Sequence, residues 1–176
     1  MTDQTNTSLR ERISRRLAER TDGVLEAIAT EYGVSLQTVV ECLASKMWTR
    51  VDGAHFIEVM TDIASWGEVT LIAHSKDAIL EFSGPLPEGR VGHGLYNLKG
   101  GGALSGHLRH EHCKAIIFLR RPFMGTETAS VQFFNAAGEA MFKIFVGRDE
   151  RRQLRPEQLA RFAALEQRFP ALAEAV

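Results

Sequence analysis

The spacing of apolar residues divides the chain into a helical N-terminal part, a strand-rich middle and a C-terminal helix. Before residue 68, apolar residues recur at intervals of three and four, which predicts helices within residues 9–17, 24–33, 35–43 and 54–66. Asp22 and Ser35 precede the second and third of these helices and are residue types preferred as N-caps. Residues 1–7 are polar and are expected to be disordered.

From residue 68 onwards, short runs of β-branched and aromatic residues alternate with glycine and proline. These runs predict seven consecutive antiparallel strands, at residues 68–74, 78–83, 92–98, 103–109, 115–121, 129–135 and 140–146. Pro156 then opens a helix whose apolar stripe includes Leu159, Phe162 and Phe169. The sequence therefore predicts an α+β fold with N-terminal helices, an antiparallel sheet of about seven strands and a closing C-terminal helix.

Composition and charge are those of a soluble globular domain. Hydrophobic residues make up 44% of the 176 residues, enough for one buried core, and the formal net charge of -1 gives no overall attraction to nucleic acid. We expect one domain over residues 21–176, preceded by a flexible or helical arm over residues 1–20. Since no stretch resembles a secretory signal or a membrane span, we expect a cytoplasmic protein, with Cys42 and Cys113 as reduced thiols.

Residues 27–43 have the form of two helices joined by a tight turn at Gly33, which is also the form of a DNA-reading helix-turn-helix. Contact with DNA requires lysine or arginine near the phosphates. Residues 21–45 contain neither, and their four carboxylates give the segment a charge of -4. A packing or dimer-contact role is therefore favoured, and a transcription regulator is the less favoured alternative.

Three of the six histidines follow a run of three glycines, in the stretch GGGALSGHLRHEHC at residues 100–113. His110 and His112 lie in a polar turn, and the spacing of the cluster matches no zinc motif. His107 lies inside a predicted strand and shares a face with Arg109 and two small side chains, which would leave a shallow floor for a flat ligand. The imidazole could serve such a ligand as an axial ligand, with Arg109 near its carboxylates.

Two further residues are candidate metal ligands. His74 ends a predicted strand on the face of Thr70 and Ile72, a position more typical of a surface or structural histidine. Tyr96 lies in a neighbouring predicted strand and is a candidate phenolate ligand, although strand tyrosines usually pack. The sequence contains no nucleophile elbow, phosphate-binding loop or paired metal motif, so catalysis has little support.

Four stretches together resemble the HutX/ChuX family of bacterial cytosolic haem-utilisation proteins. They are WGEVTLIAHSKDAILEFSGPLPEG, GLYNLKGGGALSGHLRHEHC, RPFMGTETASVQFFNAAGEAMFKIFVGRDERRQL and PEQLARF, and the resemblance spans residues 21–169. It implies a saddle-shaped antiparallel sheet flanked by helices and usually paired as a homodimer. It also implies similarity to half of the larger HemS-type haem-trafficking proteins.

The resemblance further implies a function and a set of ligands. Family members bind haem in the cytoplasm and pass it on, in some cases to a haem-degrading enzyme. His74 and His107 match the family's candidate histidine ligands. Some relatives instead use a tyrosine from a pair of adjacent tyrosines, and Tyr96 is a weaker candidate because the other position of that pair is Leu95 here. We therefore expect a haem carrier that uses His107, His74 and Arg109 and donates haem to a haem-degrading enzyme or another acceptor. The alternatives are a haem-degrading enzyme and the regulator described above.

Overall fold

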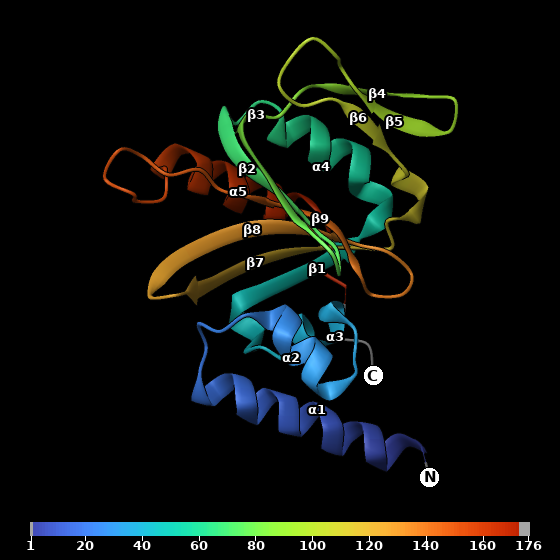
Figure 1. Ribbon diagram of the computed structural model, residues 1–176, viewed down its shortest axis with the longest axis vertical. Helices are drawn as coiled ribbons and strands as arrows, with labels where there is room; N and C mark the ends of the chain where they lie inside the picture. Colours follow the sequence, from blue (N-terminus) through green and yellow to red (C-terminus); the bar gives the residue numbers. More distant parts are fainter. Residues whose placement is uncertain (1, 173–176) are drawn as a thin grey trace.

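The computed structural model describes residues 2–172, with side chains from residue 8 onwards (Figure 1). The helices are α1 (Thr2–Glu19), α2 (Leu25–Tyr32), α3 (Leu36–Glu41), α4 (Phe56–Ile63) and α5 (Pro156–Arg168). The strands are β1 (Trp48–Asp52), β2 (Glu68–His74), β3 (Ile79–Pro85), β4 (Gly89–Gly92), β5 (Leu95–Leu98), β6 (Gly106–Leu108), β7 (Ala115–Phe123), β8 (Thr126–Phe134) and β9 (Ala140–Phe145). The predicted α+β class, with N-terminal helices, an antiparallel sheet and a C-terminal helix, is confirmed.

The strands form two antiparallel sheets where the sequence predicted a single sheet. The larger sheet has the order β1-β7-β8-β9-β2-β3 and the smaller one the order β4-β5-β6. Strand β1 was not predicted, because its segment WTRVD is short, mixes polar with apolar residues and lies between helices. The predicted strand 92–98 is broken by a tight turn at His93 and Gly94, whose φ angles are 54° and 75°. Positive φ at both positions suits a hairpin, so the chain reverses there.

The predicted strand over residues 103–109 is much shorter in the structure. Only Gly106–Leu108 form β6, and the backbone then leaves the extended conformation at Arg109, where φ is -80° and ψ is 73°. A 3₁₀ turn follows at His110–His112. The prediction that His107 shares a strand face with Arg109 and the small residues before it is therefore wrong. Too little of this segment pairs with β5 to form such a face.

Apolar layers cover one face of the larger sheet and part of the other. Helices α4 and α5 pack on one face, where Phe133 and Phe162 are fully buried (Figure 1). Helices α1 to α3 cover the β1 and β7 side of the other face, with Ile13 and Val39 packed in one cluster with Ile117. The rest of that second face, formed by β9, β2 and β3, remains more open. No helix within residues 2–172 has the length and apolar character needed to span a membrane.

The helix ends show which local predictions succeed. Ser35 caps α3, because its Oγ accepts a hydrogen bond from the Thr38 amide at 3.1 Å, as predicted. Asp22 does not cap α2, whose N-cap is Val24. Helix α1 begins at Thr2, so the disorder predicted for residues 1–7 is not observed in residues 2–7. Residues 1 and 173–176 lie outside the described part, and the predicted division at residue 21 stays a prediction.

Candidate functional site

His74, the last residue of β2, lines a cavity beside helix α2. Its side chain lies on the same face as Thr70 and Ile72, as alternation predicted, and it pairs with Ile79 of β3. The cavity has a volume of about 210 Å³. Its walls are largely apolar and are formed by Val24, Leu25, Ile72, Ile79, Leu119, Phe123 and Phe145.

Buried polar and charged groups complete the lining of this cavity. Arg121, Ser130, Gln132 and Lys143 are all buried there. Arg121 donates hydrogen bonds to two backbone carbonyls in the loop before α2. The Nε atom of Arg121 and the Oε1 atom of Gln132 have no hydrogen-bond partner within the described chain. Since a buried polar atom without a partner costs about 1–3 kcal/mol, the lining of the cavity retains hydrogen-bonding capacity that the described chain does not use.

Glu26 of helix α2 connects His74 with Lys143. The Oε1 atom of Glu26 lies 3.2 Å from Nδ1 of His74 and accepts a hydrogen bond from Nζ of Lys143. Burial by itself would raise the pKa of Glu26, but the charge and hydrogen bond of Lys143 outweigh it and hold that pKa below its usual range. At neutral pH the carboxylate is therefore ionised and can only accept hydrogen bonds. A neutral His74 thus donates from Nδ1 and keeps Nε2 unprotonated.

A larger hollow adjoins the cavity along the same face of the sheet. Its volume is about 640 Å³, and it extends to Arg148 and Arg152 in the segment after β9. Ligand pockets usually have volumes of roughly 300–1,000 Å³, so the two hollows together form a trough with room for a large ligand. The residues that line both hollows are Ile72, Glu81, Phe123, Thr128 and Phe145.

His107 lies on the smaller sheet, in β6, with an exposed side chain. It pairs with Asn97 of β5, and its Nδ1 atom lies 2.6 Å from Oδ1 of Asn97. The Nδ2 atom of Asn97 donates to the carbonyls of Arg90, Gly92 and Leu95 at 3.0–3.2 Å. This amide orientation leaves Oδ1 as the acceptor for His107. Nδ1 of His107 is therefore the donor, and Nε2 is the nitrogen available to a metal.

The structure does not bring His74 and His107 together within one chain. They lie on different sheets, and neither described hollow is lined by a residue of β4, β5 or β6. Figure 1 shows the smaller sheet at the top of the molecule, beside α4, whereas the tip of the β2–β3 hairpin points towards α2 and α3. Each histidine is therefore a separate candidate ligand in a single chain.

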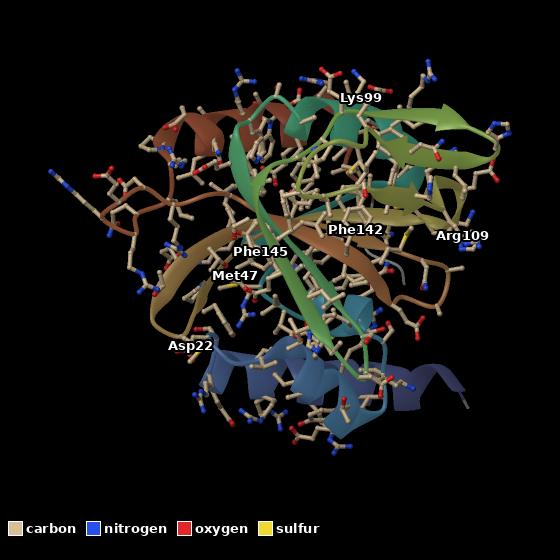
Figure 2. The ribbon with its side chains drawn as sticks, turned by 45° about the horizontal axis from the view of Figure 1, so that its top comes forward. Asp22, Met47, Lys99, Arg109, Phe142 and Phe145 are labelled. Carbon is tan, nitrogen blue, oxygen red and sulfur yellow. The ribbon has the colours of Figure 1, made fainter. Side chains whose placement is uncertain are left out.

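Tyr96 and Arg109 lie close to His107 in the sequence but take different positions. Tyr96 is 1% exposed and packs edge-on against Phe56, with ring centroids 5.6 Å apart. Burial raises the pKa of its hydroxyl, and the side chain faces away from the side of Asn97 and His107. Arg109 is exposed at the outer edge of the molecule (Figure 2). Of the two, Arg109 is accessible to a ligand and Tyr96 is not.

The other histidines and the cysteines add no further site. His110 and His112 fall in the 3₁₀ turn before β7, where His112 is exposed and His110 is partly buried. No group of three or more His, Cys, Asp or Glu side chains in residues 8–172 is arranged to hold a metal ion. Cys42 and Cys113 are both buried, and burial raises the pKa of Cys113 to about 12. Cys113 is thus an unreactive thiol in the folded chain.

Comparison with known proteins decides the family. The model of the family "Haem utilisation ChuX/HutX" matches residues 49–165. The chain belongs to this family. The intracellular heme transport protein HutX of Vibrio cholerae is 38% identical to this ChuX/HutX chain over 166 residues, which cover 94% of the chain and 86% of HutX.

Solved structures share the fold along most of this ChuX/HutX chain. A protein from Erwinia carotovora is 51% identical with a TM-score of 0.86, over 90% of this chain and 98% of that protein. The heme-binding protein ChuX is 44% identical with a TM-score of 0.81, over 89% and 97% of the two chains. Holo-PhuS from Pseudomonas aeruginosa is 16% identical with a TM-score of 0.70, and the match covers 46% of its length. The fold thus corresponds to about half of this larger protein.

Sequence reasoning missed Glu26 and Asn97, which contact His74 and His107, and Lys143, which contacts Glu26. Asn97 would have been found opposite His107 if the reversal before β5 had been recognised. Lys143 gave a weak signal, as a charged residue in the apolar strand β9. Glu26 gave none, because it lies 48 residues before His74 and on a separate helix.

We expect the neutral imidazole of His107 to carry its proton on Nδ1, and we expect Asn97→Ala to remove this preference because the acceptor is lost. The ¹⁵N chemical shifts of the ring nitrogens in mildly alkaline solution report the tautomer. Asn135→Ala is a suitable control, since Asn135 accepts hydrogen bonds from the amides of Ala137 and Glu139 in another turn. A proton on Nε2 in the unchanged protein would contradict the assignment.

Proposed function

We propose that this protein binds haem inside the cell and carries it to an acceptor protein. The observation that carries the proposal is the position of His74, which lines a trough with largely apolar walls and buried cations and is held through Nδ1 by Glu26. Haem has matching features: an apolar macrocycle, an iron that accepts imidazole ligands, and two carboxylates. The names of the relatives support the proposal, since HutX is an intracellular heme transport protein and ChuX a heme-binding protein.

The trough supplies a partner for each part of haem. Ile72 and Phe145, which line both hollows, suit the macrocycle. Arg121 in the cavity and Arg148 and Arg152 in the larger hollow are the candidate partners for the carboxylates. His74 is the candidate ligand of the iron.

His107 and Arg109 form a second, exposed haem contact in this proposal. An exposed ligand suits a carrier, because transfer to an acceptor requires release of the cargo. Tyr96 is the weakest of the candidate residues, since it would have to leave the core before it could reach haem. The acceptor, proposed as a haem-degrading enzyme or another haem-binding protein, would approach from this exposed side.

We also propose that two chains pair. Strand β3 is an edge of the larger sheet, and its Ile79 and Leu80 are 58% and 67% exposed. Uncovered edge strands with apolar side chains are usually protected by pairing or by covering elements. A dimer would also provide a route by which His74 and His107 from different chains reach the same iron.

The alternative functions have less support. HutX and ChuX are named for transport and binding of heme, so we propose a carrier without enzymatic activity. The helix pair α2 and α3 does not present a DNA-reading surface. Val39 and Val40 of α3 are fully buried, and Glu41 forms an ion pair with Arg50 at 2.9 Å. The pair therefore packs on the sheet, and nucleic acid is not a proposed partner.

In a haemin titration of the apoprotein, we expect a saturable Soret band whose intensity or position changes in His74→Ala and in His107→Ala. Loss of His74 is expected to weaken haem binding by roughly tenfold or more, because mutation of a residue that only contacts a metal ligand already lowers metal affinity by about 10–100-fold. His112→Ala is the control, because His112 is exposed and has no proposed role. A non-saturating titration would contradict haem binding, and wild-type spectra from both variants would remove both ligand assignments.

We expect bound haem to stay intact when the complex is kept with a reductant in air and catalase is present. Catalase removes peroxide that would otherwise attack haem without help from the protein. Absorbance spectra recorded over hours provide the measurement. Steady loss of the Soret band with formation of an open-chain tetrapyrrole would instead favour the haem-degrading enzyme.

Light scattering at micromolar concentration is expected to give the mass of two chains, because the edge strand β3 exposes apolar side chains that a partner would cover. Leu80→Glu places a charge on this edge and should shift the mass towards that of one chain. Leu172→Glu changes another exposed leucine, away from β3, and serves as the control. A single-chain mass for the unchanged protein would rule out the proposed pairing at this concentration.

A further inference from the structure

Helix α2 lies before the segment matched by the ChuX/HutX family model, yet it places a carboxylate against His74. The match begins at residue 49, whereas Glu26 lies in the first turn of α2. We propose that Glu26 is a positioning residue that holds His74 through Nδ1, so that Nε2 is presented to haem iron as a strong donor. This inference rests on the proposed function, which assigns the iron to His74.

Three separate elements meet at this contact. Lys143 of β9 pairs with Ile72 of β2, and His74 lies two residues after Ile72 in the same strand. Lys143 and His74 therefore lie on the same face of the sheet. Glu26 reaches this face from α2, and its Oε1 contacts both Nδ1 of His74 and Nζ of Lys143. The side chains of His74, Glu26 and Lys143 are 26%, 27% and 10% exposed. The carboxylate is thus held between two partners in a partly desolvated site.

This arrangement selects one tautomer of His74. Lys143 donates to Glu26 and stabilises the ionised carboxylate, which has no proton to donate in return. The remaining contact of Oε1 therefore requires a proton on Nδ1 of His74. In metalloproteins, a carboxylate on the second nitrogen of a histidine ligand fixes the ring orientation and raises the basicity of the ligating nitrogen. Lys143 completes the arrangement by holding the carboxylate in place.

The two candidate haem ligands consequently differ in strength. His107 is exposed and held by the neutral amide of Asn97, whereas His74 is half-buried and held by the charged carboxylate of Glu26. A charged acceptor strengthens a hydrogen bond more than a neutral one. We therefore expect His74 to hold haem iron more firmly and His107 to exchange it more readily.

Glu26→Gln tests the inference, because it removes the charge with little change of volume. Glu41→Gln is the matched control: Glu41 is also a glutamate of the N-terminal helices, is buried, and forms ion pairs with Arg10 and Arg50. The full chain is loaded with haem and reduced, and resonance Raman spectroscopy gives the iron–histidine stretching frequency. Haem loss from the ferric form to an excess of apomyoglobin gives the dissociation rate.

We expect Glu26→Gln to lower the stretching frequency and to accelerate haem loss by about 10–100-fold, and Glu41→Gln to change neither. If Glu26→Gln keeps the wild-type frequency and rate while His74→Ala loses the iron–histidine band, Glu26 has no positioning role but haem binding through His74 stands. If the unchanged chain binds no haem, the proposed function itself fails.

A measurement on the unchanged apoprotein covers the case in which Glu26→Gln does not fold. The ¹⁵N chemical shifts of His74 in mildly alkaline solution report which ring nitrogen carries the proton. A proton on Nδ1 supports the inference, and a proton on Nε2 overturns it. This result does not depend on haem, so it separates failure of the positioning role from failure of haem binding.

Discussion

The alternation of side chains along β8 and β9 is the constraint on which both the core and the candidate site depend. Val131, Phe133 and Ile144 point towards α4 and α5 and are fully buried. Gln132 and Lys143 point to the opposite face and line the cavity. Because side chains alternate with a period of two, a register slip of one residue would place Lys143 in the apolar core. Packing of the core therefore also positions the floor of the site.

That polar floor requires a partner, and helix α2 supplies it. A buried ammonium group without a counter-charge is strongly destabilising. The carboxylate of Glu26 supplies this counter-charge to the ammonium group of Lys143. Glu41 of α3 similarly pairs with Arg50 of β1. The negative charge of residues 21–45, which argues against contact with DNA, is thus partly complementary to cations on the sheet. Charge pairing and apolar packing together dock the helix pair beside the cavity.

The smaller sheet uses the same alternation for a different purpose. Tyr96 points inward and packs against Phe56 and the backbone of Gly89, where a Cβ atom would lie 2.1 Å from the tyrosine ring. Asn97 and His107 lie on the outer side. Tyr96 thus anchors the sheet to the core, and its neighbour Asn97 orients the exposed histidine. Tyr96, a candidate ligand in the sequence, is thus buried and packed in the structure.

The sequence by itself determined the α+β class, strands β2 and β7 to β9, the cap at Ser35 and the face on which His74 lies. These features follow from periodicity and capping, which act between residues a few positions apart. The strand pattern singled out His107 as a candidate axial ligand of a flat ligand, and similarity of whole stretches added the identity of that ligand, haem, and strengthened His74 as a candidate. Only the tertiary structure decided that the strands divide into two sheets, that the two histidines lie apart and that Glu26 meets His74. The physical reason is that pairing register and helix docking depend on contacts between distant segments, which no local pattern encodes.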